Sequence, residues 1–124
     1  MRANERGYSM DSGQSIVMQI ENIREIVAHC IKDLAKKGTA KAEAERIYRI
    51  ELAKEIVRQR SLGLPVTIIG DICRGNKDIA GLKFDRDVAS DLYDIVKSKI
   101  YTSKLELEIL ITFFKSEYNN KPKE

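Results

Sequence analysis

The chain has 124 residues, of which 43% are hydrophobic and 33% are charged, with a formal net charge of +3 at pH 7. This length suits one domain, the composition excludes a disordered chain, and the charge excess is too small to indicate a nucleic-acid partner by itself. The sequence has no run of about 18 apolar residues and no apolar core of a signal peptide. We therefore expect a folded cytoplasmic protein that is neither secreted nor inserted in a membrane.

The first predicted helix covers residues 14–37. Its apolar side chains advance in alternating steps of four and three residues, which is typical of a helix that packs along a neighbour. They are Ile16, Ile20, Ile23, Val27, Cys30 and Leu34. Lys36 and Lys37 place positive charge at the negative end of the helix dipole, and Gly38 supplies a left-handed residue that ends the helix.

A second helix is predicted over residues 39–62, with Thr39 as its cap. The connection at Gly38 is so short that the two helices are expected to form a hairpin. Gly63 and Pro65 end the second helix, since proline lacks an amide hydrogen and disfavours helix in the residue before it.

The segment from Gly63 to Lys77 departs from the helical periodicity on either side of it. Thr67 is placed to cap a short connector helix over about 68–74, with Gly75 and Asn76 as left-handed residues at its end. A short strand through residues 66–69 is the alternative, but the sequence offers no second β-rich run to pair with it.

A long third helix is predicted from Asp78 to Tyr118. Its apolar stripe comprises Leu82, Val88, Leu92, Ile95, Val96, Ile100, Leu107, Leu110 and Phe114. Thr102 and Ser103 open the largest gap in this stripe, and a bend is expected there.

These elements predict one all-α domain over residues 14–118, between flexible ends at 1–13 and 119–124. Its architecture is an elongated three-helix bundle made of a helical hairpin, a short connector helix and the long third helix. That third helix outruns its partners within one chain, so a homo-oligomer is expected to cover its apolar end. The residues left for another subunit are Leu107, Leu110, Phe113 and Phe114.

Residues with catalytic potential are few. His29 is the sole histidine and has no set of neighbouring ligands, whereas a zinc site needs three or four. Cys30 and Cys73 are far apart and form no Cys-x-x-Cys pair, so they are interpreted as reduced, packed residues. The serines lack a neighbouring base or a nucleophile elbow. We expect no enzyme, no metal and no cofactor.

An acidic series opens the long helix, with Asp85, Asp87, Asp91 and Asp94. The spacing of the last three places their carboxylates on one face. A solvated helix face is the favoured interpretation, because carboxylates near a helix N-terminus also stabilise its dipole. A divalent-metal site and an acidic docking stripe are the alternatives.

The predicted binding residues lie mainly in the connector. Arg74, Asn76 and Lys77 combine two cations with a turn that is suited to hold a phosphate, and Thr67 and Asp71 belong to the same segment. The turn lacks the GxxxxGK[ST] spacing of a Walker loop. A plain helix-to-helix connector is the favoured alternative. The interpretation of this segment as a DNA-binding helix-turn-helix is weaker still, because the recognition helix would begin with aspartates that repel phosphate.

Basic side chains of the long helix complete the candidate set. Lys97 and Lys104 are named as binding residues, and tyrosines such as Tyr93 and Tyr101 offer stacking surfaces for a nucleic-acid groove. Acidic neighbours dilute each of these stretches, so solvated faces and core packing remain the favoured interpretation.

The run LGLPVTIIGDICRGN at 62–76, followed by LKFDRDVASDLYDIVKSKI at 82–100, combines a GxPVT core, an Asp-x-x-Arg-Gly turn and an RDVA-type helix. It resembles a group of small helical proteins encoded in phages and prophages. The similarity covers roughly the C-terminal two thirds of the chain. The resemblance implies a phage-associated origin and no catalytic residues. It also implies a role in phage DNA metabolism or in neutralising a host defence complex.

We therefore expect a non-enzymatic, phage-associated binding protein that acts in the host cytoplasm on nucleic acid or on a nucleic-acid-handling protein complex. An inhibitor of a bacterial defence system, of the anti-CRISPR kind, is the first alternative. A metal-dependent enzyme built on the aspartates is the least favoured.

Overall fold

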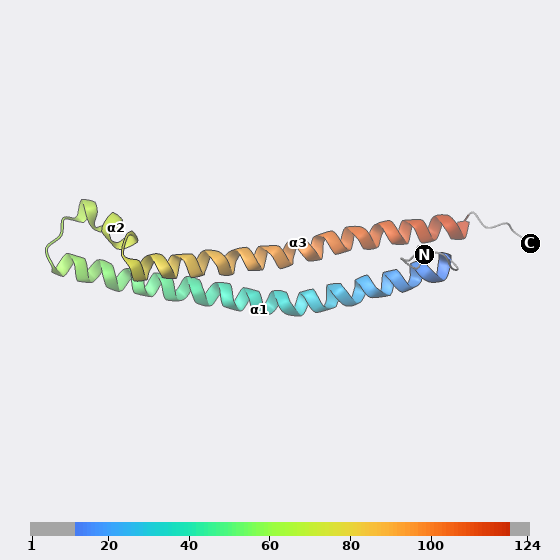
Figure 1. Cartoon of the computed structure of the whole chain (residues 1–124), viewed down its shortest axis with the longest axis horizontal. Coiled ribbons are helices and arrows are strands. Elements are labelled where there is room, and N and C mark those ends of the chain that lie inside the picture. The colour runs from blue at the N-terminus through green and yellow to red at the C-terminus, as the bar shows by residue number, and fades with distance from the viewer. Residues whose placement is uncertain (1–11, 120–124) are drawn as a thin grey trace, which may run out of the picture. The chain divides into compact units, whose positions relative to one another are not determined.

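The computed structural model describes residues 12–119 and forms, over that part of the chain, three α-helices and no strand. Helix α1 spans Ser12–Ser61, α2 spans Val66–Arg74 and α3 spans Lys77–Asn119 (Figure 1). The prediction of an all-α bundle with a short connector helix and a long last helix is confirmed.

The chain divides into two compact units, each of which contains part of α1 and part of α3. The described part of the terminal unit is 12–33 and 96–119, and the central unit is Leu34–Ile95, which includes α2. Within each unit the two long helices run antiparallel (Figure 1). The predicted flexible ends at 1–13 and 119–124 lie outside the described residues, apart from 12, 13 and 119, which belong to helices.

The predicted helix break at Gly38 is wrong, because α1 continues through it. Thr39 caps no new helix, since its Oγ1 donates to the carbonyl of Ala35, one turn earlier, over 3.1 Å. A Cβ atom on Gly38 would lie 3.3 Å from Cε1 of Tyr93. Glycine in a helix interior costs about 0.5–1 kcal/mol relative to alanine, and here it makes room for a ring of α3. The hairpin is therefore formed by α1 with α3.

The end of α1 falls at the predicted place. Gly63 has a φ of 88°, in the left-handed region that favours glycine. Its amide donates to the carbonyl of Arg60 over 3.0 Å, and the amide of Leu64 donates to the carbonyl of Gln59 over 3.3 Å. These bonds satisfy carbonyls that the last turn of a helix leaves without partners.

The connector helix forms without its predicted caps. Helix α2 begins at Val66, after Pro65, and has no side-chain cap, so the capping role predicted for Thr67 is wrong. Gly75 has a φ of −85°, in the right-handed region, and no non-glycine residue of the described chain has a positive φ. The left-handed conformations predicted for Gly75 and Asn76 are therefore both wrong. Pro65, with a φ of −64° and a ψ of 142°, is the residue before the helix, and its carbonyl accepts from the amide of Ile68 over 3.2 Å.

The core of each unit is a narrow seam between the helices. In the central unit α2 inserts Ile69 and Cys73, which are 4% and 0% exposed. The remaining buried residues of that unit are Tyr48, Gln59 and Ile79, and those of the terminal unit are Ile23, Cys30, Val96 and Leu110. The predicted packing role of both cysteines is confirmed, and both are free thiols.

One buried or half-buried side chain from each turn of α3 lies on this seam, in alternating steps of four and three. They are Leu82, Arg86, Ala89, Tyr93, Val96, Ile100, Ser103, Leu107 and Leu110. Val88, Leu92 and Ile95 were predicted to belong to this stripe, but they are 39%, 42% and 60% exposed. They form a second apolar row with almost the same periodicity, and periodicity alone merges the two rows.

Two further predictions for α3 concern the residues left for another subunit and the bend at residues 102–103. Leu107 and Leu110 were predicted to await another subunit, yet the first is half-buried and the second is buried. Phe113 and Phe114 are exposed, as predicted for residues left to another subunit, although Phe114 was also predicted to belong to the apolar stripe. The helix continues through residues 102–103, and the bend expected there stays a prediction.

Candidate functional site

A groove with a volume of about 570 Å³ lies between α1 and α3 in the central unit. Its lining residues are Gly38, Lys41, Ala42 and Glu45 of α1 and Arg86, Asp87, Ser90 and Tyr93 of α3. Charged side chains of both signs line it beside the Tyr93 ring, so the groove is a mixed-charge surface.

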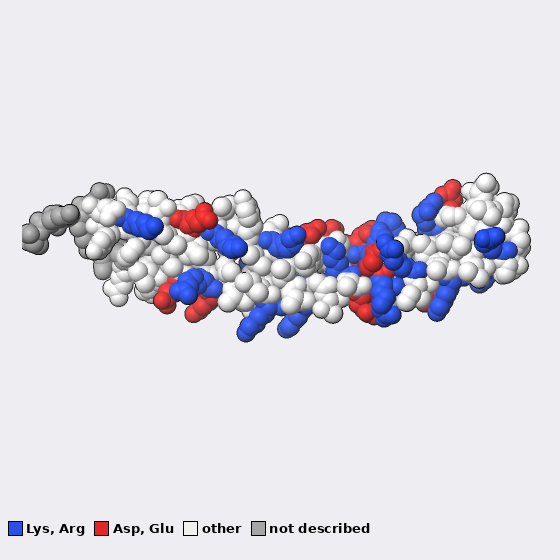
Figure 2. Space-filling view, turned by 180° about the vertical axis from the view of Figure 1, so that it is seen from behind, with Lys and Arg blue, Asp and Glu red and all other residues white. Residues whose placement is uncertain are grey.

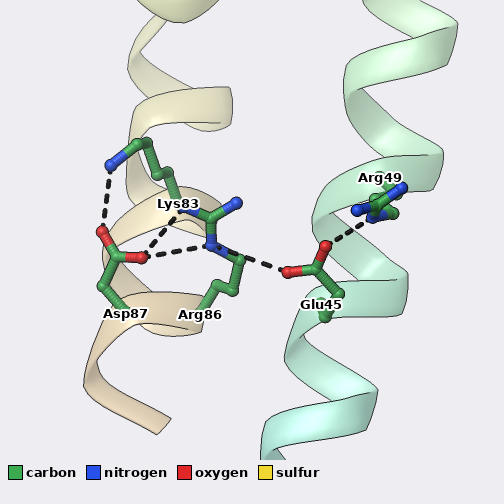
Figure 3. Close-up of polar contacts among 5 residues, drawn as sticks. All are labelled: Glu45, Arg49, Lys83, Arg86 and Asp87. Carbon is green, nitrogen blue, oxygen red and sulfur yellow. Dashed lines mark hydrogen bonds and ion pairs between the residues drawn. The ribbon is translucent and has the colours of Figure 1, made fainter. Parts of the chain in front are cut away.

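Arg86 is the side chain that joins the two walls of this groove. Its Nε and Nη2 donate to Oδ1 of Asp87 over 3.1 and 3.0 Å, and Nε lies 3.6 Å from Oε1 of Glu45 (Figure 3). The guanidinium carbon lies 4.6 Å from the centre of the Tyr48 ring. Since the side chain is only 27% exposed, these contacts hold it against α1.

The other charges of the groove are also engaged. Lys83 donates to Oδ2 of Asp87 over 3.0 Å, and this bond, followed by the bonds from Arg86, lowers the pKa of Asp87. Glu45 pairs with Arg49 (Figure 3). The Lys41 ammonium lies 4.7 Å from the centre of the Tyr93 ring. These contacts across the groove join α1 to α3.

A second surface of the central unit is apolar, and we call it the central ridge. It consists of Phe84, Val88, Leu92 and Ile95, which are 68%, 39%, 42% and 60% exposed. Steps of four, four and three residues place these side chains on one side of α3. Asp85 and Asp91 lie three residues before and after Val88, a spacing that makes them neighbours of the ridge on the helix surface. Both carboxylates are exposed, as is Asp94, and none of the three forms an ion pair within the described chain. The ridge is therefore an apolar strip with an acidic border.

The metal alternative for the acidic series has no support in the geometry. Asp87 is engaged by Lys83 and Arg86. Within residues 12–119 no three side chains of His, Cys, Asp or Glu gather closely enough to hold a metal ion. His29 is exposed on α1, as expected for an ordinary helix-surface residue.

The predicted connector residues all lie in the central unit. Arg74 donates to Oδ1 of Asp71 over 3.0 Å, so its charge is paired. Oδ1 of Asn76 accepts from the backbone amides of Asp78 and Ile79 over 2.9 and 3.1 Å, and Asn76 thereby caps α3. Sequence reasoning found Asn76 but gave it the end of α2 rather than the start of α3.

The remaining predicted residues form no hydrogen bond or ion pair with Asp71 or Arg74 within the described chain. Thr67 and Lys77 are exposed and form no hydrogen bond with Asp71 or Arg74. Lys97 and Lys104 are exposed and belong to the terminal unit. The structure therefore assembles no convergent phosphate cradle from the seven predicted residues, and their binding role stays a prediction.

Sequence reasoning missed Arg86 and the central ridge. A signal for Arg86 was present, because it occupies a seam position where the neighbouring turns carry Leu82 and Ala89. The ridge was missed because three of its four residues, Val88, Leu92 and Ile95, were assigned to the core stripe.

Comparison of the chain with models of protein families, with curated proteins and with solved structures finds no match. The resemblance to phage-encoded helical proteins therefore stays a prediction. None of the described helices combines the length and the apolar character that crossing a membrane requires.

Proposed function

We propose that this chain is a non-enzymatic binding protein that docks its central ridge onto a basic surface of a nucleic-acid-handling protein. The observation that carries the proposal is the pairing of exposed apolar side chains with unpaired aspartates on one helix. A row of exposed large apolar residues is typical of an interaction surface. Its acidic border complements a partner whose apolar patch is surrounded by Lys and Arg, and surfaces that contact nucleic acid have this charge.

Direct contact with nucleic acid is less well supported, because the basic side chains of the central unit are largely paired. The pairs are Arg46 with Glu43, Arg49 with Glu45, Lys54 with Glu51, Arg58 with Glu55, Arg74 with Asp71, and Lys83 and Arg86 with Asp87. Acidic and basic side chains accordingly lie beside each other in the space-filling view (Figure 2). Phosphate binding requires cations that are free to replace counterions.

The phage-type sequence pattern supports a partner inside a bacterial cell. A component of phage DNA metabolism has a basic surface of the required kind. So does a host defence complex, which the chain would inhibit by covering that surface. Both roles use the same ridge.

The first test is retention of a partner from a nuclease-treated extract of the host bacterium by the immobilised chain. The ridge variant Phe84→Ser/Ile95→Ser removes the two most exposed ridge side chains. Its control, Val57→Ser/Leu62→Ser, removes two side chains of the same unit that are 67% and 62% exposed but lie outside the ridge. We expect the wild type and the control to retain one protein in stoichiometric amount, and the ridge variant to lose it.

Three outcomes would contradict the proposal. One is equal retention by the ridge variant, and another is retention of the partner only from an extract that has not been treated with nuclease. The third is gel retardation of DNA or RNA by the wild-type chain at low salt, which would favour direct contact with nucleic acid.

A further inference from the structure

A separate apolar row lies on α3 in the terminal unit, and we call it the outer row. It consists of Tyr101, Leu105, Ile109 and Phe113, which are 65%, 42%, 58% and 60% exposed. Residues four apart form one of the ridges through which helices interlock, because such a ridge fits the groove between two ridges of a neighbouring helix. The outer row has no such neighbour within the described chain.

The groove that would receive such a ridge lies directly beside the outer row. A hollow of about 440 Å³ is lined by Leu105, Glu108, Ile109, Thr112 and Phe113. Of these, Glu108 and Thr112 belong to the next row of residues four apart, so the hollow is the groove between the two rows. The same helix therefore carries both a ridge and a matching groove, and this is the condition for a two-fold interface between identical surfaces.

The order of side chains in the outer row fits an antiparallel second copy. The row reads aromatic, aliphatic, aliphatic, aromatic, and it is symmetric about Leu107. An antiparallel copy places Tyr101 level with the second copy's Phe113, and Leu105 level with its Ile109. Aromatic side chains then meet aromatic ones, and aliphatic side chains meet aliphatic ones.

The charges beside the row are complementary in the same arrangement. Lys104 and Glu108 are exposed on the neighbouring row, and neither forms an ion pair within residues 12–119. The two-fold at Leu107 places Lys104 of one copy level with Leu110 of the other. Lys104 is then offset from the other copy's Glu108 by two residues, about 3 Å along the helix, which a lysine side chain can span, and the symmetry repeats the contact. A partner of unrelated sequence would share neither the palindromic order nor this reciprocal pair. We infer that the outer row is the interface of a homodimer in which two α3 helices cross antiparallel.

This interface is independent of the central ridge, so its test can fail without affecting the proposed function. Sedimentation velocity of the full chain over a range of concentrations should show a monomer–dimer equilibrium. Ile109→Ser should weaken the dimer about tenfold or more, which corresponds to about 1.4 kcal/mol. The control Ile31→Ser changes a residue of the same unit that is 54% exposed on α1, and should leave the equilibrium unchanged.

Exchange of the charges tests the antiparallel direction without altering the apolar row. Lys104→Glu and Glu108→Lys should each weaken the dimer, and the double variant should recover it, because the reciprocal pair is restored with its signs exchanged. A wild-type chain that stays monomeric or forms a larger oligomer would overturn the inference. So would a dimer that is unaffected by Ile109→Ser, or a double charge variant weaker than both single ones.

Discussion

At Arg86 the seam of α3 carries a charge where the turns on either side carry aliphatic side chains. The guanidinium remains there because it has three partners, namely the Tyr48 ring, the Asp87 carboxylate and the more distant carboxylate of Glu45. The ammonium group of lysine cannot make the same contacts, because it neither stacks on a ring as a planar group nor presents the same pair of hydrogen-bond donors. Arg86 therefore links α3 to the turn of α1 that carries Glu45 and Tyr48.

Replacing Arg86 by lysine tests this role. Arg86→Lys keeps the charge but loses the stacking and the second hydrogen bond, so the free energy of unfolding should fall by about 1 kcal/mol. Urea denaturation measures the change. Arg60→Lys is the control, because Arg60 is exposed and forms no ion pair in the described chain. Equal effects of the two substitutions would show that Arg86 is an ordinary surface arginine.

The two glycines inside the long helices should respond differently to alanine. Gly81 has no atom within 4 Å of an added Cβ, so Gly81→Ala should stabilise the fold by about 0.5–1 kcal/mol. At Gly38 the new Cβ lies 3.3 Å from Tyr93, and the crowding opposes the gain in helix propensity. Gly38→Ala should therefore stabilise less than Gly81→Ala, or destabilise. The same gain in thermal or urea denaturation for both variants would mean that Gly38 makes no close helix contact.

At the scale of the helix, α3 depends on a cap that lies outside it. Asn76→Ala removes the acceptor of two backbone amides and should lower the free energy of unfolding by about 1 kcal/mol. Asn22→Ala changes an exposed asparagine inside α1 and should have no destabilising effect, because alanine is the better helix former. Denaturant titrations of both variants test the difference, which should vanish if Asn76 does not cap the helix.

The last turns of α1 should make stability depend on acid. Hydrogen bonds from Arg58, and then from Gln59, lower the pKa of Glu55 below its ordinary value of 4.5. The folded state binds a proton at the Glu55 carboxyl more weakly than the unfolded state does. The contribution of Glu55 to stability is therefore complete above pH 4.5 and is lost as the pH falls through the lowered pKa. Glu55→Gln should thus lose less stability than the wild type between neutral pH and about pH 3.

The control for the acid test is Glu106→Gln, which changes an exposed glutamate of α3 without an ion pair. Its urea midpoint should follow the wild-type pH profile. If Glu55→Gln also follows that profile, the contacts of Glu55 do not stabilise the fold.

The end of α1 could be predicted from the sequence because its causes are local. Gly63 and Pro65 act on their own residues and their immediate neighbours, and they end α1 where expected. Gly38 was misinterpreted because its reason, the ring of Tyr93, lies in another helix. The central ridge was missed for a similar reason, since Val88 and Leu92 follow nearly the same period as the seam. Only the contacts of α1 decide which of the two rows is buried.

The acidic part of the candidate site could be predicted, because charge runs are visible in the sequence. The interpretation of this acidic series changed because its aspartates have different surroundings in the structure. Asp87 faces two cations in the groove, whereas Asp91 and Asp94 remain without an ion pair beside the ridge. Pairing depends on neighbours in space, and sequence spacing does not supply them.

At the scale of the whole molecule, each unit buries one narrow seam and leaves large apolar side chains exposed. The central ridge has an acidic border, whereas the outer row has a reciprocal pair of opposite charges. These borders suit different occupants, a basic protein surface for the first and a second copy of the chain for the second. If two copies of the chain pair through their outer rows, the dimer carries two central ridges, one on each copy.

Photo-cross-linking in bacterial cells that express the chain tests the central claim most directly. A benzoylphenylalanine placed at Phe84, which is 68% exposed on the ridge, is compared with the same group at Arg60, which is exposed on α1. We predict one discrete protein adduct from position 84 and none from position 60. Equal adducts from both positions, or cross-linking of position 84 to nucleic acid instead of protein, would contradict the account.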